Sequence, residues 1–310
     1  MDISDTIAPI DRLEDVLQRF GFQVGLFHTG ALCGRVPFEQ AEGRGFLHFL
    51  RRGRLRVHHS VPGHPRVLEL DRPSLLFYPS GAAHAFTTFD GDHGGGGKDA
   101  AHATRDRSSA EACGAGADLT CAAVHFDGGA QHPLVAGLPA AIILPTCEVQ
   151  GLQAALDLLF DEADRLLCGH RLLANRLFEV VLVQLLRWLF DHPAAAGVTP
   201  GLVQALSDPR LSRAVVAIHE RPGHAWSLDA LAARAGMSRT AFTGAFRRCM
   251  GCSVGEYIAG YRVLSAKREL ARGRQVAQVS DELGYSSPTA FVRMFRSREG
   301  TTPKQWVMRK

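Results

Sequence analysis

The chain has 310 residues, 46% of them hydrophobic, and a formal net charge of +4 at pH 7, which suits a sizeable core and two domains. Its most apolar run, residues 180–190, contains Gln184 and Arg187 and is too short to span a bilayer, which argues against an integral membrane protein. Seven cysteines, an odd number, and an acidic opening without a signal peptide argue against a secreted disulfide framework and predict a cytoplasmic protein.

The charge is unevenly distributed along the chain. Residues 208–310 hold 18 Lys and Arg against 8 Asp and Glu, a net charge of +10, and the remaining residues hold 17 against 23, a net charge of −6. A basic excess confined to one module is typical of a domain that binds a polyanion. We therefore expect the last third of the chain to bind nucleic acid.

Taken in chain order, the sequence predicts a short helix in residues 1–20 and a β-domain in residues 22–145. Its predicted strands are short apolar runs between Gly and Pro residues: GFLHFL (45–50), RLRVHHS (54–60), RVLEL (66–70), SLLFYPSG (74–81), HAFTTF (84–89), DLTCAAVHF (118–126) and AAIILP (140–145). Short strands at regular intervals are typical of a β-sandwich or barrel. Residues 90–118 contain four consecutive glycines and predict a loop inserted between two strands.

Two histidines in this β-domain carry a resemblance to cupins. Residues 79–84, PSGAAH, resemble the second cupin motif P-x-G-x-x-H, and His48 stands where the first cupin motif carries histidine. The chain departs from the family pattern because His48 stands alone, Pro73 replaces the usual Gly, and no Asn follows His84. The resemblance implies a cupin-like barrel without the full set of ligands of a cupin metalloenzyme.

Residues 149–192 change to a helical period. One predicted stripe contains Leu152, Leu156 and Leu159, and a wider one contains Leu185 and Trp188 among other apolar residues. A face that broad usually buries against more than one neighbour, so we expect it to pair with a second subunit and form a homodimer. The alternative is burial within the monomer alone. Residues 193–201, rich in Pro, Ala and Gly, predict a linker.

The segment from Ser227 to Trp306 contains one unit twice. Five residues recur 49 positions later: Phe242, Phe246, Arg247, Gly251 and Tyr257 return as Phe291, Phe295, Arg296, Gly300 and Trp306. Each copy predicts a helix, a tight turn at Gly236 or Gly284, and a second helix capped by Ser238 or Ser287. Two helices joined in this way place the second one in a major groove of DNA.

This doubled unit, the joining helix at 257–271 and the closing GTTPKQW resemble the DNA-binding domain of the AraC/XylS family of bacterial transcription regulators. The resemblance implies promoter DNA and RNA polymerase as partners, and no enzymatic activity. It leaves activation and repression equally open. The predicted fold is α+β, with a cupin-like sensor domain at 1–147, a helical dimerisation or linker region at 148–207 and a double helix-turn-helix domain at 208–310.

Residues opposite the core-facing Phe pairs are the expected DNA contacts. In the first copy they are Arg239, Thr240 and Thr243 at bases and Arg247 at phosphate; in the second they are Thr289, Val292 and Arg293 at bases and Arg296 at phosphate. Arginine pairs with guanine through two hydrogen bonds, and Thr and Val methyl groups contact the thymine methyl. Because the first copy has few long polar side chains, we expect its phosphate contacts to dominate.

The cupin-type sensor domain of one AraC subgroup supplies a hypothesis for the signal. In that subgroup a Cys stands on a late strand, and here Cys121 precedes the phrase HFDGGAQHPLVAGLP. The set His48, His84 and Cys121 suits Zn²⁺ or another divalent metal ion. The alternative is that these are structural histidines and a buried thiol.

The same resemblance implies an oxidant response through cysteines, with Cys33, Cys113 and Cys121 as the candidates. The leading interpretation is therefore a sequence-specific regulator whose cupin-like domain senses a small ligand, a metal ion or an oxidant. The alternative is a cupin metalloenzyme with an appended DNA-binding module.

Overall fold

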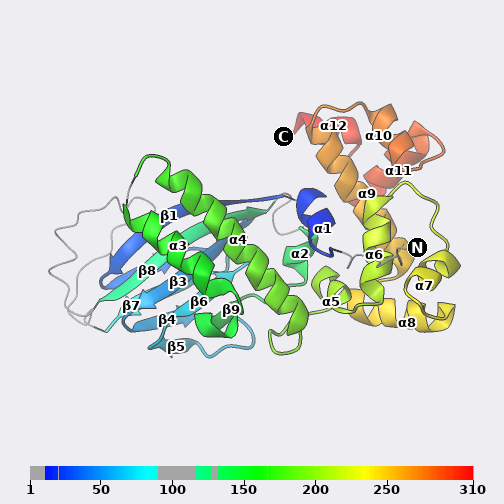
Figure 1. The fold of residues 1–310 in the computed structure, drawn as a ribbon. Helices are drawn as coiled ribbons and strands as arrows, with labels where there is room; N and C mark the ends of the chain where they lie inside the picture. The colour runs from blue at the N-terminus through cyan, green and yellow to red at the C-terminus, as the bar shows by residue number, and fades with distance from the viewer. Residues whose placement is uncertain (1–10, 20, 90–115, 127–131, 166, 310) are drawn as a thin grey trace, which may run out of the picture. The chain divides into compact units, whose positions relative to one another are not determined.

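The computed structural model describes residues 11–19, 21–89, 116–126, 132–165 and 167–309 (Figure 1). Two compact units divide the chain at residues 199 and 200. One unit holds residues 20–199, and the other joins residues 200–310 to the described part of residues 1–19. The sequence predicted that the DNA-binding domain begins at residue 208. In the structure this unit also includes residues 200–207 and the helix at Glu14–Arg19.

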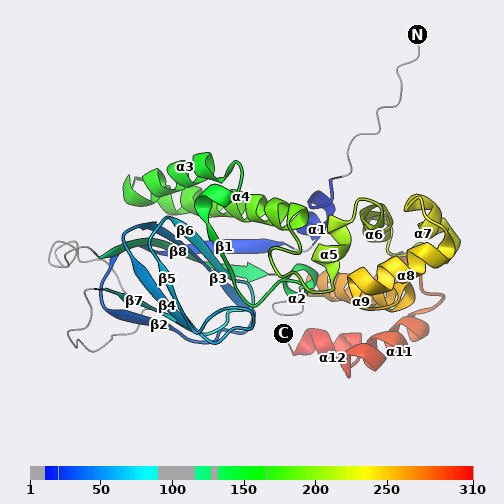
Figure 2. The same ribbon diagram turned by 90° about the horizontal axis from the view of Figure 1, so that it is seen from below.

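The first unit is built from two antiparallel sheets that face each other (Figure 2). One sheet has the strand order β1-β8-β3-β6-β9 and the other β2-β7-β4-β5. The strands are β1 (Phe22–Leu32), β2 (Arg35–Phe38), β3 (Arg44–Arg52), β4 (Leu55–His59), β5 (Val67–Leu70), β6 (Ser74–Tyr78), β7 (His84–Thr88), β8 (Ala117–Phe126) and β9 (Ile142–Pro145). The short elements α2 (Pro133–Ala136) and η4 (Thr146–Glu148) complete this part. The predicted cupin-like sandwich is confirmed.

Strand β3 shows why both faces of the five-stranded sheet are apolar. Side chains alternate between the faces of a strand, so Phe46 and Leu50 enter the core between the sheets while Phe49 points to the other face. On that outer face the Phe49 ring lies 6.1 Å from Phe160 and 5.9 Å from Phe178. These two rings belong to α3 (Leu152–Arg165) and α4 (His170–Asp191), which cover this sheet in both views (Figures 1 and 2).

The apolar face of α4 is divided between core and surface. Leu185 and Val181 are fully buried within one chain, whereas Leu172, Leu173 and Val180 are exposed. Leu185, considered from sequence for either a dimer interface or the monomer core, therefore lies in the core. The exposed side chains of the same helix lie on its other face.

Strands β1 and β2 were not predicted from sequence, and the end of the predicted insert was misplaced. Strand β1 contains Gly25, Thr29 and Gly30 and has a register shift between Leu26 and His28, which interrupts the alternation that identifies a strand. Residues 90–115 of the predicted insert lie outside the described residues. Its last residues differ from the prediction because β8 begins at Ala117 and pairs with both β1 and β3.

The second unit consists of helices: α1 (Glu14–Arg19), α5 (Leu202–Ser207), α6 (Leu211–Glu220), α7 (Leu228–Arg234), α8 (Arg239–Met250), α9 (Val254–Ala271), α10 (Val276–Glu282), α11 (Pro288–Glu299) and α12 (Pro303–Met308). Helices α7 and α8 form the first predicted helix-turn-helix copy, and α10 and α11 form the second. In the described parts of the chain, no helix is both long and apolar enough to cross a bilayer.

Helix α9 is shared by the two copies. Near its start, Tyr257 packs against Phe246 of α8, with ring centroids 5.7 Å apart. Its later residues Val263, Ala266 and Leu270 join the core of the second copy with Phe291 and Phe295. One helix thus supplies part of the hydrophobic core of both copies.

Candidate nucleic-acid interface and sensor core

The second helix of each copy begins and ends in the same way. Ser238 accepts a hydrogen bond from the Ala241 backbone at the start of α8, as Ser287 does from Ala290 at the start of α11. Gly251 and Gly300 end these helices with φ of 78° and 70°, a left-handed conformation that glycine adopts without strain. These caps confirm the two predicted helices. Each of the two helices has its polar face exposed to solvent.

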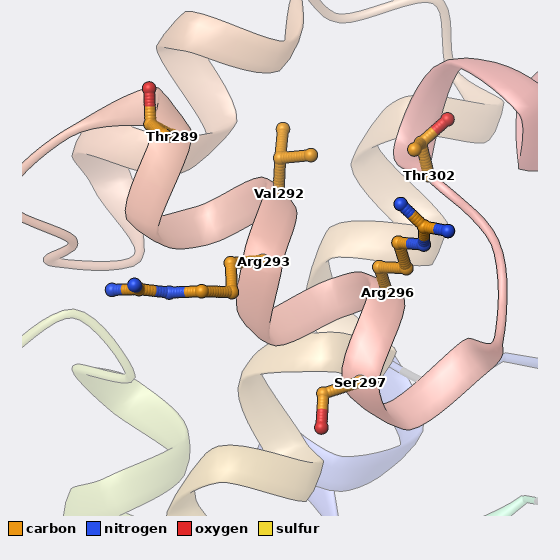
Figure 3. A pocket seen from close by; sticks show the side chains of 6 residues that line it. All are labelled: Thr289, Val292, Arg293, Arg296, Ser297 and Thr302. Atoms are coloured by element: carbon orange, nitrogen blue, oxygen red, sulfur yellow. The ribbon is translucent and has the colours of Figure 1, made fainter.

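Helix α11 gathers the four residues predicted for the second copy. Thr289, Val292, Arg293 and Arg296 line one shallow surface depression together with Ser297 and Thr302 (Figure 3). Phe291 and Phe295 point to the core on the opposite side of the helix. The two guanidinium groups diverge: that of Arg296 reaches toward Thr302, and that of Arg293 extends away from it (Figure 3). A concave, cationic face with an apolar centre fits the edge of a base pair flanked by phosphates.

Helix α8 presents the first-copy residues, but two of them already have partners. The Arg239 guanidinium lies 3.4 Å from the Asp229 carboxylate of α7. The Thr243 hydroxyl donates to the backbone carbonyl of Arg239 at 2.9 Å, which leaves its methyl group as the available contact. Thr240 and Arg247 are exposed on the same helix. The expected emphasis of this face on phosphate contacts stays a prediction.

The core between the two sheets contains a pair of buried histidines. Nε2 of His48 on β3 lies 3.0 Å from Nε2 of His84, the first residue of β7 on the facing sheet. His84 Nδ1 donates to the Ala82 carbonyl at 2.9 Å, because a carbonyl oxygen only accepts. In a neutral His84, Nε2 is then the acceptor, and His48 donates to it from Nε2. The remaining nitrogen, His48 Nδ1, is a buried acceptor without a hydrogen-bond partner in the described structure.

Burial keeps this pair uncharged. It lowers the pKa of His84 to about 4, and it holds the pKa of His48 well below the ordinary value, with the neighbouring His84 lowering it further. Aromatic rings surround the imidazoles: Tyr78 stacks on His84 at 3.9 Å, and Phe38 lies 4.8 Å from His48 and 4.7 Å from His84. The histidines therefore form a neutral polar centre inside an aromatic shell.

Cys121 lies on the same face of the sheet as His48. It is paired with His48 across β8 and β3 and with His28 across β8 and β1, so the three residues form a row over three strands. Its thiol is free and buried in the apolar core, and this burial raises its pKa. A buried thiol with a raised pKa stays protonated, which is neither the nucleophilic nor the ligating form.

The structure brings the three predicted metal ligands only partly together. No group of three or more His, Cys, Asp or Glu side chains within the described residues is arranged to hold a metal ion. His48 and His84 meet, but their facing nitrogens contact each other, and Cys121 packs among apolar side chains. Of the other redox candidates, Cys33 is disulfide-bonded, and Cys113 lies outside the described residues.

Comparisons with known proteins agree with both units. The model of a cupin family matches residues 11–191, and that of a helix-turn-helix domain matches residues 231–309. A helix-turn-helix transcriptional regulator of Haemophilus influenzae is 28% identical to 56% of this chain and 57% of its own length. A putative AraC-like transcription regulator of Streptomyces antibioticus is 28% identical to 56% of this chain and 58% of its own length. The transcriptional activator RclR of Escherichia coli is 25% identical to 61% of this chain and 66% of its own length.

The chain belongs to the AraC family of transcription regulators, with an N-terminal cupin domain. The matches span about three-fifths of the lengths of these relatives.

Several residues of this AraC-family chain were missed by sequence reasoning. Ser297 and Thr302 line the depression on α11, and the Thr-Pro pair that caps α12 was the available signal for Thr302. Tyr78 and His59 extend the buried polar centre, since the Tyr78 hydroxyl lies 2.9 Å from His59 Nδ1. Their burial depends on the facing sheet and has no local sequence signature.

Proposed function

We propose that this chain is a sequence-specific DNA-binding regulator of transcription that reads DNA with α8 and α11. The observation that carries the proposal is the depression on α11, where Val292, Arg293 and Arg296 stand together on a solvent-exposed face. The net charge of +10 over residues 208–310 supports it, because Lys and Arg contacts with phosphates release condensed counterions. Double-stranded promoter DNA and RNA polymerase are the proposed partners.

The test is selection of duplexes from a random pool by the full chain, followed by affinity measurements at several salt concentrations. Arg293→Ala should relax base preference at one position at a cost of about 1–3 kcal/mol. Arg296→Ala should weaken binding to all sequences and reduce the salt dependence. Arg165→Ala, which removes one exposed guanidinium from the cupin unit, is the charge-matched control and should change neither property. Selection of no sequence by the wild type would refute the proposal.

A homodimer is proposed through the exposed stripe of α3 and α4. Leu158 is 61% exposed, Leu172 64% and Leu173 51%, which is unusual for leucines on helices whose other faces are buried. Leu172→Lys should convert a dimer to a monomer in native mass measurements. Gln150→Lys adds the same charge at an exposed polar position and should not, whereas Leu185→Lys should unfold the unit. A wild type that is monomeric at working concentrations would contradict the dimer.

The cupin unit is the proposed receiver of the signal, with the His48–His84 pair as its centre. The support is Nδ1 of His48, an acceptor buried in the aromatic core without a hydrogen-bond partner in the described structure, because such a group is stabilised by a hydrogen-bonding or coordinating ligand. His84→Phe should abolish any change in DNA affinity caused by Zn²⁺, peroxide or a small-molecule screen, and leave basal DNA binding intact. A response preserved in His84→Phe would place the signal elsewhere.

A further inference from the structure

Arg262, on the middle of the shared helix α9, joins parts of both helix-turn-helix copies. Its Nε donates to the Pro222 carbonyl at 2.6 Å, and an Nη group donates to the His224 carbonyl at 3.0 Å. These carbonyls belong to the segment that leads from α6 into α7 of the first copy. The same guanidinium lies 5.5 Å from the ring centroid of Tyr285, which directly follows the turn of the second copy.

The turn of the second copy also touches this segment through backbone atoms. Gly284 has φ of +73°, and a Cβ added there would lie 2.0 Å from the Gly223 carbonyl oxygen. Conversely, a Cβ on Gly223 would lie 2.1 Å from the Glu282 carbonyl oxygen. Only two glycines allow the backbones to approach so closely. Arg262 therefore closes a junction at which the segment before α7, the turn before α11 and α9 meet.

Two further contacts join α9 to α11. Lys267 forms an ion pair with Glu299 at 2.9 Å, and Arg298 donates to the Glu256 carbonyl at 3.3 Å. These interactions bind the second copy to the shared helix. Arg262 differs because one planar group bonds the first copy and stacks on the second.

We propose that Arg262 is a positioning residue that sets the separation and rotation of α8 and α11, and so selects the spacing between the two DNA elements they read. This inference rests on the proposed function. One base pair added between two elements displaces the second by about 3.4 Å along the axis and about 35° around it. If the junction is rigid, α8 and α11 cannot both bind their elements after that displacement. If the junction is loosened, both helices can still bind.

The experiment uses the full chain and the duplex that the wild type selects from a random pool. Affinities are measured for that duplex and for versions with one base pair inserted or deleted between the two elements. The wild type should lose affinity by about 10-fold or more on insertion or deletion, because a preorganised pair of modules gains only when both engage. In Arg262→Ala, affinity for the original duplex should fall about 10-fold while the altered duplexes change little, so the preference for spacing nearly disappears.

Arg262→Lys keeps the charge but cannot bond two carbonyls and stack at once, so its preference for spacing should be intermediate. Thermal unfolding shows whether Arg262→Ala folds. If it does not fold, the spacing preference of Arg262→Lys tests the inference. Arg272→Ala removes an exposed guanidinium at the end of α9 and should retain the wild-type preference. An unchanged preference in both Arg262 variants overturns the inference, and an equal loss on all three duplexes assigns Arg262 to direct DNA contact instead. A wild type that selects no duplex refutes the proposed function itself.

Discussion

The two helix-turn-helix copies look equivalent in sequence, yet they differ at the turn. Gly236 and Gly284 both adopt positive φ, 62° and 73°. A Cβ on Gly236 would meet nothing within 4 Å, whereas on Gly284 it would collide with the backbone of Gly223. The same residue therefore serves local conformation alone in the first copy and, in the second, also the packing of one copy against the other.

The reading helices differ as well. Arg239 of the first copy is paired with Asp229, while no ion pair within the described residues involves Arg293 or Arg296 of the second. Duplication thus preserves caps and core, and the exposed faces diverge. We expect the second copy to contribute more of the base discrimination, and the following measurements sharpen or break that expectation.

The largest expected effect comes from the turn glycines. Gly284→Ala should lower the free energy of unfolding by about 3–5 kcal/mol, because a backbone clash adds to the strain of positive φ. Gly236→Ala should cost only about 1–2 kcal/mol, the conformational strain alone. Chemical denaturation of both variants measures the difference. Equal losses would show that the Gly223–Gly284 contact contributes nothing.

The next largest effect is expected from the arginines on the two reading helices, Arg293 and Arg239. Arg293→Ala should lower discrimination at one base position by about 1–3 kcal/mol. Arg239→Ala should lower it by less than about 1 kcal/mol, since that guanidinium must first leave Asp229. Affinities for a set of single-base-substituted duplexes measure both. A larger effect at Arg239 would reverse the assignment of the dominant reader.

A smaller gain is expected from releasing Arg239. Asp229→Asn removes the partner of this arginine and should increase base discrimination by the first copy by about 0.5 kcal/mol, the typical value of an exposed ion pair. Asp281→Asn removes an exposed acid from α10 of the second copy and is the control. It should raise affinity for all duplexes uniformly. If the two variants behave alike, Asp229 acts only through general charge.

The smallest effect should follow Thr243→Val. Its hydroxyl is bonded to the helix backbone, so valine keeps the exposed methyl and should change DNA affinity by less than about 0.5 kcal/mol. Thr243→Ala removes that methyl and should weaken binding to a duplex with thymine at the contacted position. Duplexes with uracil in place of that thymine provide the matching measurement. A large loss in Thr243→Val would mean that the hydroxyl reaches a base.

Local chemistry determined much of this protein from sequence alone. The caps at Ser238 and Ser287, the ends at Gly251 and Gly300 and the repeated Phe pairs depend on residues within a few positions of each other. For that reason the double helix-turn-helix was predictable. Most strands of the β-domain were predictable as well, because alternation and turn residues are also local. Strand β1 was not, since its glycines and register shift hide the period that pairing with β8 restores.

Only the tertiary structure decided which predicted residues meet. His48 and His84 are 36 positions apart and belong to facing sheets, so their contact depends on how the sheets close. The same closure places Cys121 in apolar surroundings, and this burial raises the pKa of its thiol. Leu185 and Leu172 share a helix, and only the packing of that helix decides which one is buried. The contacts of Arg262 and Gly284 with the segment before α7 arise in the same way, because residues distant in sequence become neighbours only after the helices pack.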